Sequence, residues 1–229
     1  MSSIRVKICG LKTQPALEAA LDAGADYVGF VFYPKSPRNI SYADAAKLAK
    51  LAHGKAQVVA LLVDPDDAQV HDVLQIVNPG IMQLHGHETP QRVAEVAAIA
   101  RRPVIKAIPV ASQADAMSAT GYASSAAMIL FDAKPPPVTP GPGGSTFLPG
   151  GNGIAFDWNL LASVKDAVPY MLSGGLTPDN VADAIRQTGA THVDVSSGVE
   201  SAPGVKDPEL IRRFIRAAKA AKQMPTFAR

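Results

Sequence analysis

The sequence predicts an α/β protein built as a single-domain (β/α)8 barrel, the TIM barrel. Short apolar runs alternate with longer amphipathic segments about eight times in 229 residues, and this alternation is typical of βα units around a parallel sheet. The length agrees, because α/β barrels often reach this size as one domain. An open doubly wound sheet is the alternative fold. Its dinucleotide-binding pattern, G-x-G-x-x-G, is absent from Cys9-Gly10-Leu11-Lys12 after the first strand, which favours the barrel.

The expected strands are short apolar runs, several of them without polar interruption. Such runs are typical of parallel strands that are buried on both faces. We expect strands at residues 4–9, 27–32, 57–63, 81–84, 104–108, 127–132, 170–173 and 192–195.

The expected helices begin at recognisable capping sequences. A capping side chain followed by proline marks a first helical turn. This pairing occurs at Asp64-Pro65, Thr89-Pro90, Thr177-Pro178 and Asp207-Pro208, and Ser41 followed by Asp44 begins a further helix.

The connection after the sixth expected strand is long and rich in residues that disfavour regular structure. Residues 135–153 hold six prolines and six glycines, and the helical pattern resumes at Asp157. We expect residues 138–147 to be a disordered surface loop; a lid at the catalytic rim is the alternative. The barrel domain is expected over residues 1–222, with residues 223–229 as a loose tail.

Composition excludes several classes of function. The net charge of +2 gives no case for binding nucleic acid or an anionic membrane surface. A single cysteine excludes an internal disulfide and fits a reducing compartment. We find no signal peptide and no apolar run long enough to span a bilayer, so we expect a cytoplasmic protein. The sequence does not distinguish a monomer from a homodimer.

Two strand ends carry candidates for proton transfer. Alternation places Lys7 and Cys9 on one face of the first strand, and a nearby cation lowers the pKa of a thiol. Asp132 ends the otherwise apolar sixth strand. A base candidate and an acid candidate at strand ends fit a barrel, whose active groups lie at the carboxyl ends of its strands. Taken singly, Cys9 is equally compatible with a small buried apolar residue and Asp132 with a helix cap.

Glycines and serines after the last two strands indicate a phosphate site. Gly174 and Gly175 follow the seventh strand, and Ser197 and Gly198 follow the eighth. Backbone N–H groups exposed by such turns favour anions, and barrels often bind phosphate at these two loops. Tight turns without a ligand are the alternative.

Two further positions lie on expected rim loops. Arg38 follows the second strand within a proline-stiffened segment, where a guanidinium can hold a carboxylate in bidentate fashion or remain solvated. His85 and His87 follow the fourth strand and raise the question of a metal. No convincing further ligands accompany them, so we expect no metal, with His85 lining the pocket and His87 facing solvent.

Taken together, these segments resemble the phosphoribosylanthranilate isomerase family. The resemblance runs in order from residue 4 to about residue 220 and rests on Lys7-Ile8-Cys9-Gly10, Phe32-Tyr33-Pro34-Lys35-Ser36-Pro37-Arg38, Gln83-Leu84-His85-Gly86, Asp132, Phe156-Asp157-Trp158, Leu172-Ser173-Gly174-Gly175-Leu176 and Asp194-Val195-Ser196-Ser197-Gly198-Val199-Glu200.

The resemblance implies an isomerase of tryptophan biosynthesis that acts on a phosphorylated aminosugar without cofactor or metal. It implies Cys9 as general base, Asp132 as general acid and Arg38 as the binder of the anthranilate carboxylate. Gly153 is expected on the phosphate side. The chain departs from the family in the length of its 135–153 segment and in Asn152, where many members have serine or threonine.

Three other functions remain as alternatives. The related histidine-pathway isomerase has an aspartate where this chain has Cys9. Indoleglycerol-phosphate synthase relies on lysine and glutamate at strand ends; Lys7 and Lys106 are compatible with it, but no strand-end glutamate supports it. A non-catalytic barrel that binds a phosphate ligand is the third, and the presence of both Cys9 and Asp132 argues against it.

Overall fold

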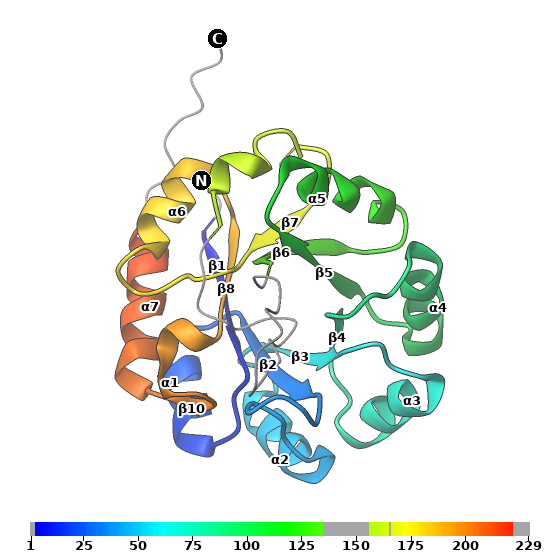
Figure 1. Ribbon diagram of the computed structural model, residues 1–229. Coiled ribbons are helices and arrows are strands. Elements are labelled where there is room, and N and C mark those ends of the chain that lie inside the picture. The colour runs from blue at the N-terminus through cyan, green and yellow to red at the C-terminus, as the bar shows by residue number, and fades with distance from the viewer. Residues whose placement is uncertain (1–2, 135–155, 165, 222–229) are drawn as a thin grey trace, which may run out of the picture.

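The computed structural model describes residues 3–134, 156–164 and 166–221, and these form a closed barrel of eight parallel strands with helices packed around it (Figure 1). The (β/α)8 prediction is therefore confirmed. The segment at residues 135–153, which includes Gly153, lies outside the described residues. The expected tail at residues 223–229 does so too.

The strands follow the expected apolar runs to within two residues at either end. They are β1 (Arg5–Cys9), β2 (Tyr27–Phe32), β3 (Gln57–Leu62), β4 (Ile81–Leu84), β5 (Val104–Val110), β6 (Met128–Ala133), β7 (Tyr170–Leu172) and β8 (His192–Val195). The barrel closes because β1 pairs with both β2 and β8, so that Lys7 lies beside Tyr27 on one side and Asp194 on the other.

The α-helices lie outside the barrel, on the connections between strands (Figure 1). They are α1 (Gln14–Asp22), α2 (Tyr42–Ala52), α3 (Asp67–Ile76), α4 (Pro90–Ala100), α5 (Gln113–Met117), α6 (Val181–Thr188) and α7 (Pro208–Ala220). Short 3-10 turns occupy η1 (Ser118–Tyr122), η2 (Trp158–Leu161) and η3 (Ser197–Val199). None of the described helices is both long and apolar enough to cross a membrane.

Strand alternation sorts the side chains between two cores. Residues such as Met82 and Leu84 point outward and join the large core between the strands and the helices. Val59 and Ile105 belong to a separate core inside the barrel. Cys9 belongs to a third small cluster with Val31 and Leu61. Apolar side chains thus fill the inside of the barrel, and Cys9 packs with other strand-end residues near the mouth.

Three expected helix starts are corrected by the structure. α3 is capped by Asp66, whose side chain accepts from the Gln69 N–H, and Asp64 adopts a left-handed φ of 46°. The Asp64 carboxylate accepts the backbone N–H of His87 instead, so a contact between two loops overrides the local capping signal.

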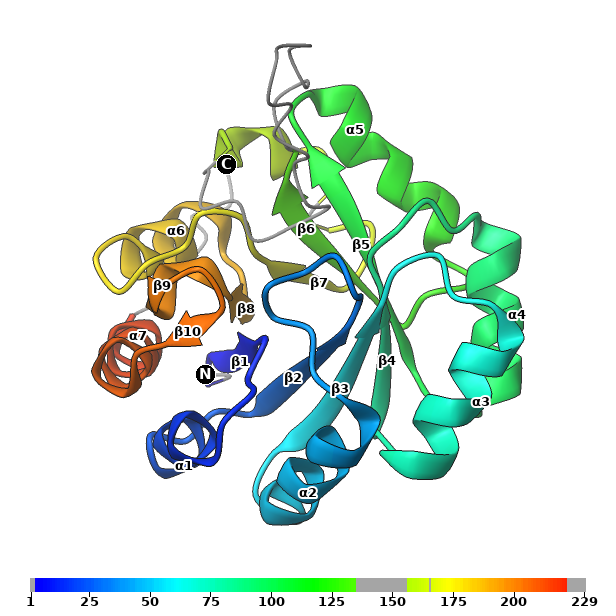
Figure 2. The same cartoon turned by 60° about the horizontal axis from the view of Figure 1, so that its bottom comes forward.

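The other two corrections concern the last third of the chain. α6 begins at Val181 and not at Pro178, because the Asn180 side chain turns back to accept the Thr177 N–H. The segment after Asp157 forms only the 3-10 turn η2, which Asp157 caps. A hairpin that the sequence did not predict, β9 (Glu200–Ala202) with β10 (Val205–Lys206), lies between β8 and α7 (Figure 2).

Candidate active site

The base candidate lies at the end of a buried charge network on the β1 side of the barrel mouth. Cys9 is the last residue of β1 and is buried. Lys7, two residues earlier on the same strand, is fully buried, and its Nζ lies 2.9 Å from Oδ1 of Asp194 on β8. The hydroxyl of Ser173 donates to the other carboxylate oxygen of Asp194 at 3.1 Å. The Lys7 ammonium is thus paired within the barrel, as a buried charge must be.

The expected lowering of the Cys9 pKa does not occur. Burial raises the pKa of the Cys9 thiol above its ordinary value of 9.0, and the negative charge of Asp194 adds to this. Lys7 and Lys206 pull the pKa down, but their effect is smaller than that of burial. The prediction was wrong because it counted the cation beside the thiol and not the burial of the thiol, whose effect on the pKa is the largest and to which Asp194 adds. Cys9 is therefore a protonated thiol at neutral pH in this structure.

The acid candidate lies across the mouth, on β6, and faces a single histidine. Asp132 is almost completely buried. Its Oδ2 lies 3.3 Å from Nε2 of His85, and its Oδ1 accepts the Ala133 N–H at 2.9 Å. His85 comes from the β4 end, so the structure brings together two residues that the sequence had placed on separate strands.

Gln83 contacts His85 on the side of the ring that faces away from Asp132. The amide nitrogen of Gln83 lies 3.2 Å from Nδ1 of His85. Nε2 of the same ring is the nitrogen that faces Asp132. The Gln83 carbonyl oxygen is buried with no hydrogen-bond partner among the described residues.

A second buried ion pair holds the loop after β4. Lys106 Nζ lies 2.7 Å from Oε2 of Glu88 and donates to the Gly86 carbonyl at 2.7 Å. Glu88 also accepts the backbone N–H groups of Asp64 and Gly86. This cluster fixes the segment that follows His85.

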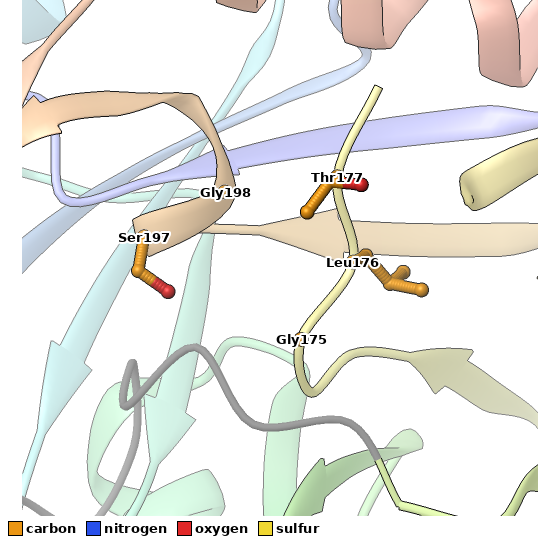
Figure 3. A pocket seen from close by; sticks show the side chains of 5 residues that line it. All are labelled: Gly175, Leu176, Thr177, Ser197 and Gly198. Atoms are coloured by element: carbon orange, nitrogen blue, oxygen red, sulfur yellow. The ribbon is translucent and has the colours of Figure 1, made fainter. Parts of the chain in front are cut away.

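The predicted phosphate loops meet at one hollow. A cavity of about 240 Å³ is lined by Gly175, Leu176, Thr177, Ser197 and Gly198, from the loops after β7 and β8 (Figure 3). The two loops touch, because a Cβ on Gly198 would lie only 1.9 Å from the Leu176 carbonyl oxygen. Gly174 has a φ of +81° and packs against Ala133. Two glycines and the small side chain of Ser197 thus line a small open space, and such glycine-rich turns can bind an anion.

Arg38 is not a solvated rim residue. It is 5% exposed, and Glu200 accepts from its Nε at 2.8 Å and from its Nη2 at 2.9 Å. Sequence reasoning missed Glu200 as a site residue, although it closes the segment that carries Ser197 and Gly198. It also missed Asp194 and Gln83. Polar residues inside apolar strands are the signal by which Asp194 and Gln83 could have been found.

The His-x-His pattern does not form a cluster of ligands. The His87 side chain is 94% exposed and its Nδ1 lies 3.2 Å from Asp64 Oδ2, so it faces solvent as expected, whereas His85 is buried against Asp132. In the described part of the chain, no group of three or more His, Cys, Asp and Glu side chains is placed to hold a metal ion.

Comparison with known proteins gives a consistent family. Residues 6–217 match the family described as N-(5'phosphoribosyl)anthranilate (PRA) isomerase. An N-(5'-phosphoribosyl)anthranilate isomerase of Rhodopseudomonas palustris is 54% identical over 96% of this chain and 97% of its own length. One from Parvibaculum lavamentivorans is 52% identical over 96% of this chain and all of its own length.

Solved structures with the same family name are similar to this chain. A phosphoribosyl anthranilate isomerase of Thermotoga maritima superposes with a TM-score of 0.83 and 37% identity, over 94% of this chain and 98% of that one. A phosphoribosyl anthranilate isomerase in complex with reduced 1-(o-carboxyphenylamino)-1-deoxyribulose 5-phosphate gives a TM-score of 0.80 at 36% identity, with the same coverage.

Proposed function

The chain belongs to the N-(5'-phosphoribosyl)anthranilate isomerase family, and we propose that Asp132 and Cys9 are the acid and the base of its reaction. The enzyme is an isomerase of tryptophan biosynthesis. It converts N-(5-phosphoribosyl)anthranilate to 1-(2-carboxyphenylamino)-1-deoxyribulose 5-phosphate by an Amadori rearrangement. The observation that carries the assignment of residues is the placement of both groups, buried, at the carboxyl ends of β1 and β6.

Asp132 opens the sugar ring. Its carboxyl group protonates the ring oxygen as the bond from C1 to that oxygen breaks, and the anilino nitrogen supplies the electron pair that forms an iminium ion. The Nε2–H of His85, 3.3 Å from Oδ2, then stabilises the carboxylate that remains. A positioned proton transfer of this kind contributes roughly 10²–10⁴-fold to the rate.

Cys9 removes the proton from C2 of the iminium ion. The product is an enolamine that tautomerises to the ketone. Burial keeps the pKa of the thiol high in the free enzyme, so Cys9 must first lose its own proton to act as a base. The iminium cation formed in the first step lowers that pKa and the thiol proton passes to solvent. The resulting thiolate takes the C2 proton, which the same cation makes more acidic. The order of events is therefore ring opening first and proton abstraction second.

The rest of the mouth binds the two anionic ends of the substrate. The hollow lined by Gly175, Ser197 and Gly198, with Gly174 beside it in the chain, takes the phosphate, and the lack of side-chain bulk at its glycines supports this. Arg38 takes the anthranilate carboxylate.

A cytoplasmic location belongs to this proposal as well. Cys9 is the single cysteine of the chain, and it must remain a thiol to act as the base. Reducing compartments maintain free thiols.

The proposal is tested by turnover of the fluorescent substrate N-(5-phosphoribosyl)anthranilate, with indoleglycerol-phosphate formation assayed separately. The wild-type chain should consume the substrate without forming indoleglycerol phosphate. Asp132→Asn should abolish turnover with the fold intact, because an amide cannot donate the proton. Cys9→Ser should lose several orders of magnitude, because a hydroxyl is a far weaker base at neutral pH. Near-normal turnover by either folded variant would remove that residue from its role.

A further inference from the structure

Arg38 and Glu200 form a planar, buried pair that joins the loop after β2 to the β9–β10 hairpin. Two parallel N–H···O bonds of 2.8 and 2.9 Å link them, and both side chains are less than a tenth exposed. The residues are 162 positions apart in the chain. A bidentate contact of this kind fixes the plane of a guanidinium as well as its position.

Lys206, on β10, completes a cluster of three charges. Its Nζ lies 2.7 Å from Oε1 of Glu200 and donates to the backbone carbonyl of Ser196 at 2.8 Å. Burial alone would raise the pKa of Glu200, but hydrogen bonds from Arg38 and the charge of Lys206 hold that pKa below its usual range. Glu200 is thus an anion between two cations when Lys206 is protonated, and the cluster carries one net positive charge.

Backbone contacts close the space around this cluster. A Cβ on Gly10 would lie 2.9 Å from Cδ of Arg38, so the side chain packs directly on the loop after β1. The Gly204 N–H donates to Oε2 of Glu200 at 3.1 Å, and a Cβ at Gly204 would meet the Pro37 carbonyl oxygen at 2.4 Å. The hairpin tip therefore rests against the segment that carries Arg38. Figure 2 shows this hairpin between β8 and α7.

We propose that Glu200 is a positioning residue that makes the site selective for substrates bearing an aryl carboxylate, by holding the Arg38 guanidinium in one plane. The inference rests on the proposed role of Arg38 in carboxylate binding. In this proposal Glu200 acts through Arg38. A carboxylate alone beside Arg38 would cancel its charge, and Lys206 restores the net positive charge that an anionic ring substituent requires.

The cluster of Arg38, Glu200 and Lys206 is also linked to Cys9, through Ser196. Lys206 lies 3.2 Å from the Ser196 hydroxyl, which donates to the Cys9 carbonyl at 3.3 Å. A loss of Glu200 that merely loosened the fold would disturb Cys9 and the phosphate loop as well as Arg38. Selectivity for the carboxylate therefore separates a positioning role from a structural one.

The test measures binding of two unreactive probes to the full-length enzyme by calorimetry. One probe is reduced 1-(o-carboxyphenylamino)-1-deoxyribulose 5-phosphate, and the other is its phenylamino counterpart without the carboxyl group. Wild type should prefer the first. In Glu200→Gln that preference should fall by about 10²-fold, because a misplacement of about 1 Å at such a contact has an effect of this size. Binding of the second probe should change little.

Two further variants keep the inference falsifiable. Glu200→Asp retains the charge and should lose part of the preference even if Glu200→Gln fails to fold. Arg38→Lys combined with a Glu200 variant should lose no more preference than Arg38→Lys alone, since the two residues act as a unit. Glu209→Gln is the matched control, because Glu209 pairs with Arg216 at 3.0 Å on the exposed face of α7. It should bind both probes as wild type does.

Three results would overturn the inference. Equal weakening of both probes in the Glu200 variants would show a structural role. Unchanged preference in folded Glu200→Gln and Glu200→Asp would show that Arg38 needs no such support. Equal binding of the two probes by wild type would overturn the carboxylate-binding role of Arg38 itself, and with it the role of Glu200.

Discussion

The two sides of the barrel mouth place different charges around the two proposed proton-transfer residues, Cys9 and Asp132. On the β1 side, Cys9 lies near Lys7, Asp194 and Lys206, each of them buried and paired. On the β6 side, Asp132 faces His85, whose other ring nitrogen contacts the Gln83 amide. The proposed base thus has several fixed charges near it, whereas the proposed acid has one histidine as its side-chain partner among the described residues.

The comparison extends to a second buried ion pair. Lys7–Asp194 and Lys106–Glu88 have similar lengths, 2.9 and 2.7 Å, and both lysines are almost completely buried. The first acts on the pKa of Cys9, whereas the second ties down the loop after β4. The same interaction therefore has an electrostatic role on one side and a positional role on the other.

The largest expected effect separates these two pairs. Lys7→Met and Lys106→Met each leave a buried carboxylate unpaired, which costs about 3–5 kcal/mol of unfolding free energy. Lys7→Met should in addition lower kcat strongly, because Cys9 loses the cation that opposes the effect of burial on its pKa. Lys106→Met should lower kcat much less. Urea unfolding and steady-state rates on the same preparations measure both quantities.

One outcome would contradict this prediction. If the two variants lose equal kcat at equal loss of stability, the Lys7 charge has no specific action on Cys9. The difference between the two sides of the mouth would then be one of position only.

A smaller effect is expected on the pH at which the Cys9 thiol ionises. Because the folded pKa of Cys9 lies above 9.0, the protonated thiol contributes stability that is present below that pH and is lost as the pH rises through the folded pKa. Thiolate absorbance near 240 nm, with Cys9→Ser as the blank, should therefore be small at pH 9.0 in the folded enzyme and should appear on unfolding. A folded thiolate already formed at pH 7 would mean that Lys7 and Lys206 outweigh burial after all.

The sequence predicted the barrel well because its strand signal is local. β2 and β4 begin and end as expected, since buried parallel strands are continuous apolar runs that turn residues interrupt. The N-cap residue of a helix was less predictable where two neighbouring residues could serve as the cap. Asp64-Pro65-Asp66 contains two candidate caps, and a backbone N–H from His87, in another loop, decided between them.

The site was predictable in its types of residue and less so in its pairings. Cys9, Asp132 and Arg38 stand out locally, as a lone cysteine, a strand-end acid and a rim arginine. Their partners lie far away in sequence, as Glu200 does from Arg38, and no local pattern reports such a contact. The predicted direction of the pKa shift at Cys9 was wrong mainly because no local pattern reports how deeply the thiol is buried, and Asp194 adds to the effect of burial.

The central claim assigns ring opening to Asp132 and proton abstraction to Cys9, and substrate deuterated at C2 tests it most directly. The isotope effect on kcat should increase in Cys9→Ser, because removal of the C2 proton then limits the rate. Asp132→Asn should turn over neither the deuterated nor the ordinary substrate, because ring opening fails before C2 is reached. An isotope effect that is unchanged in Cys9→Ser, or near-normal turnover by folded Asp132→Asn, would contradict the assignment of the two roles.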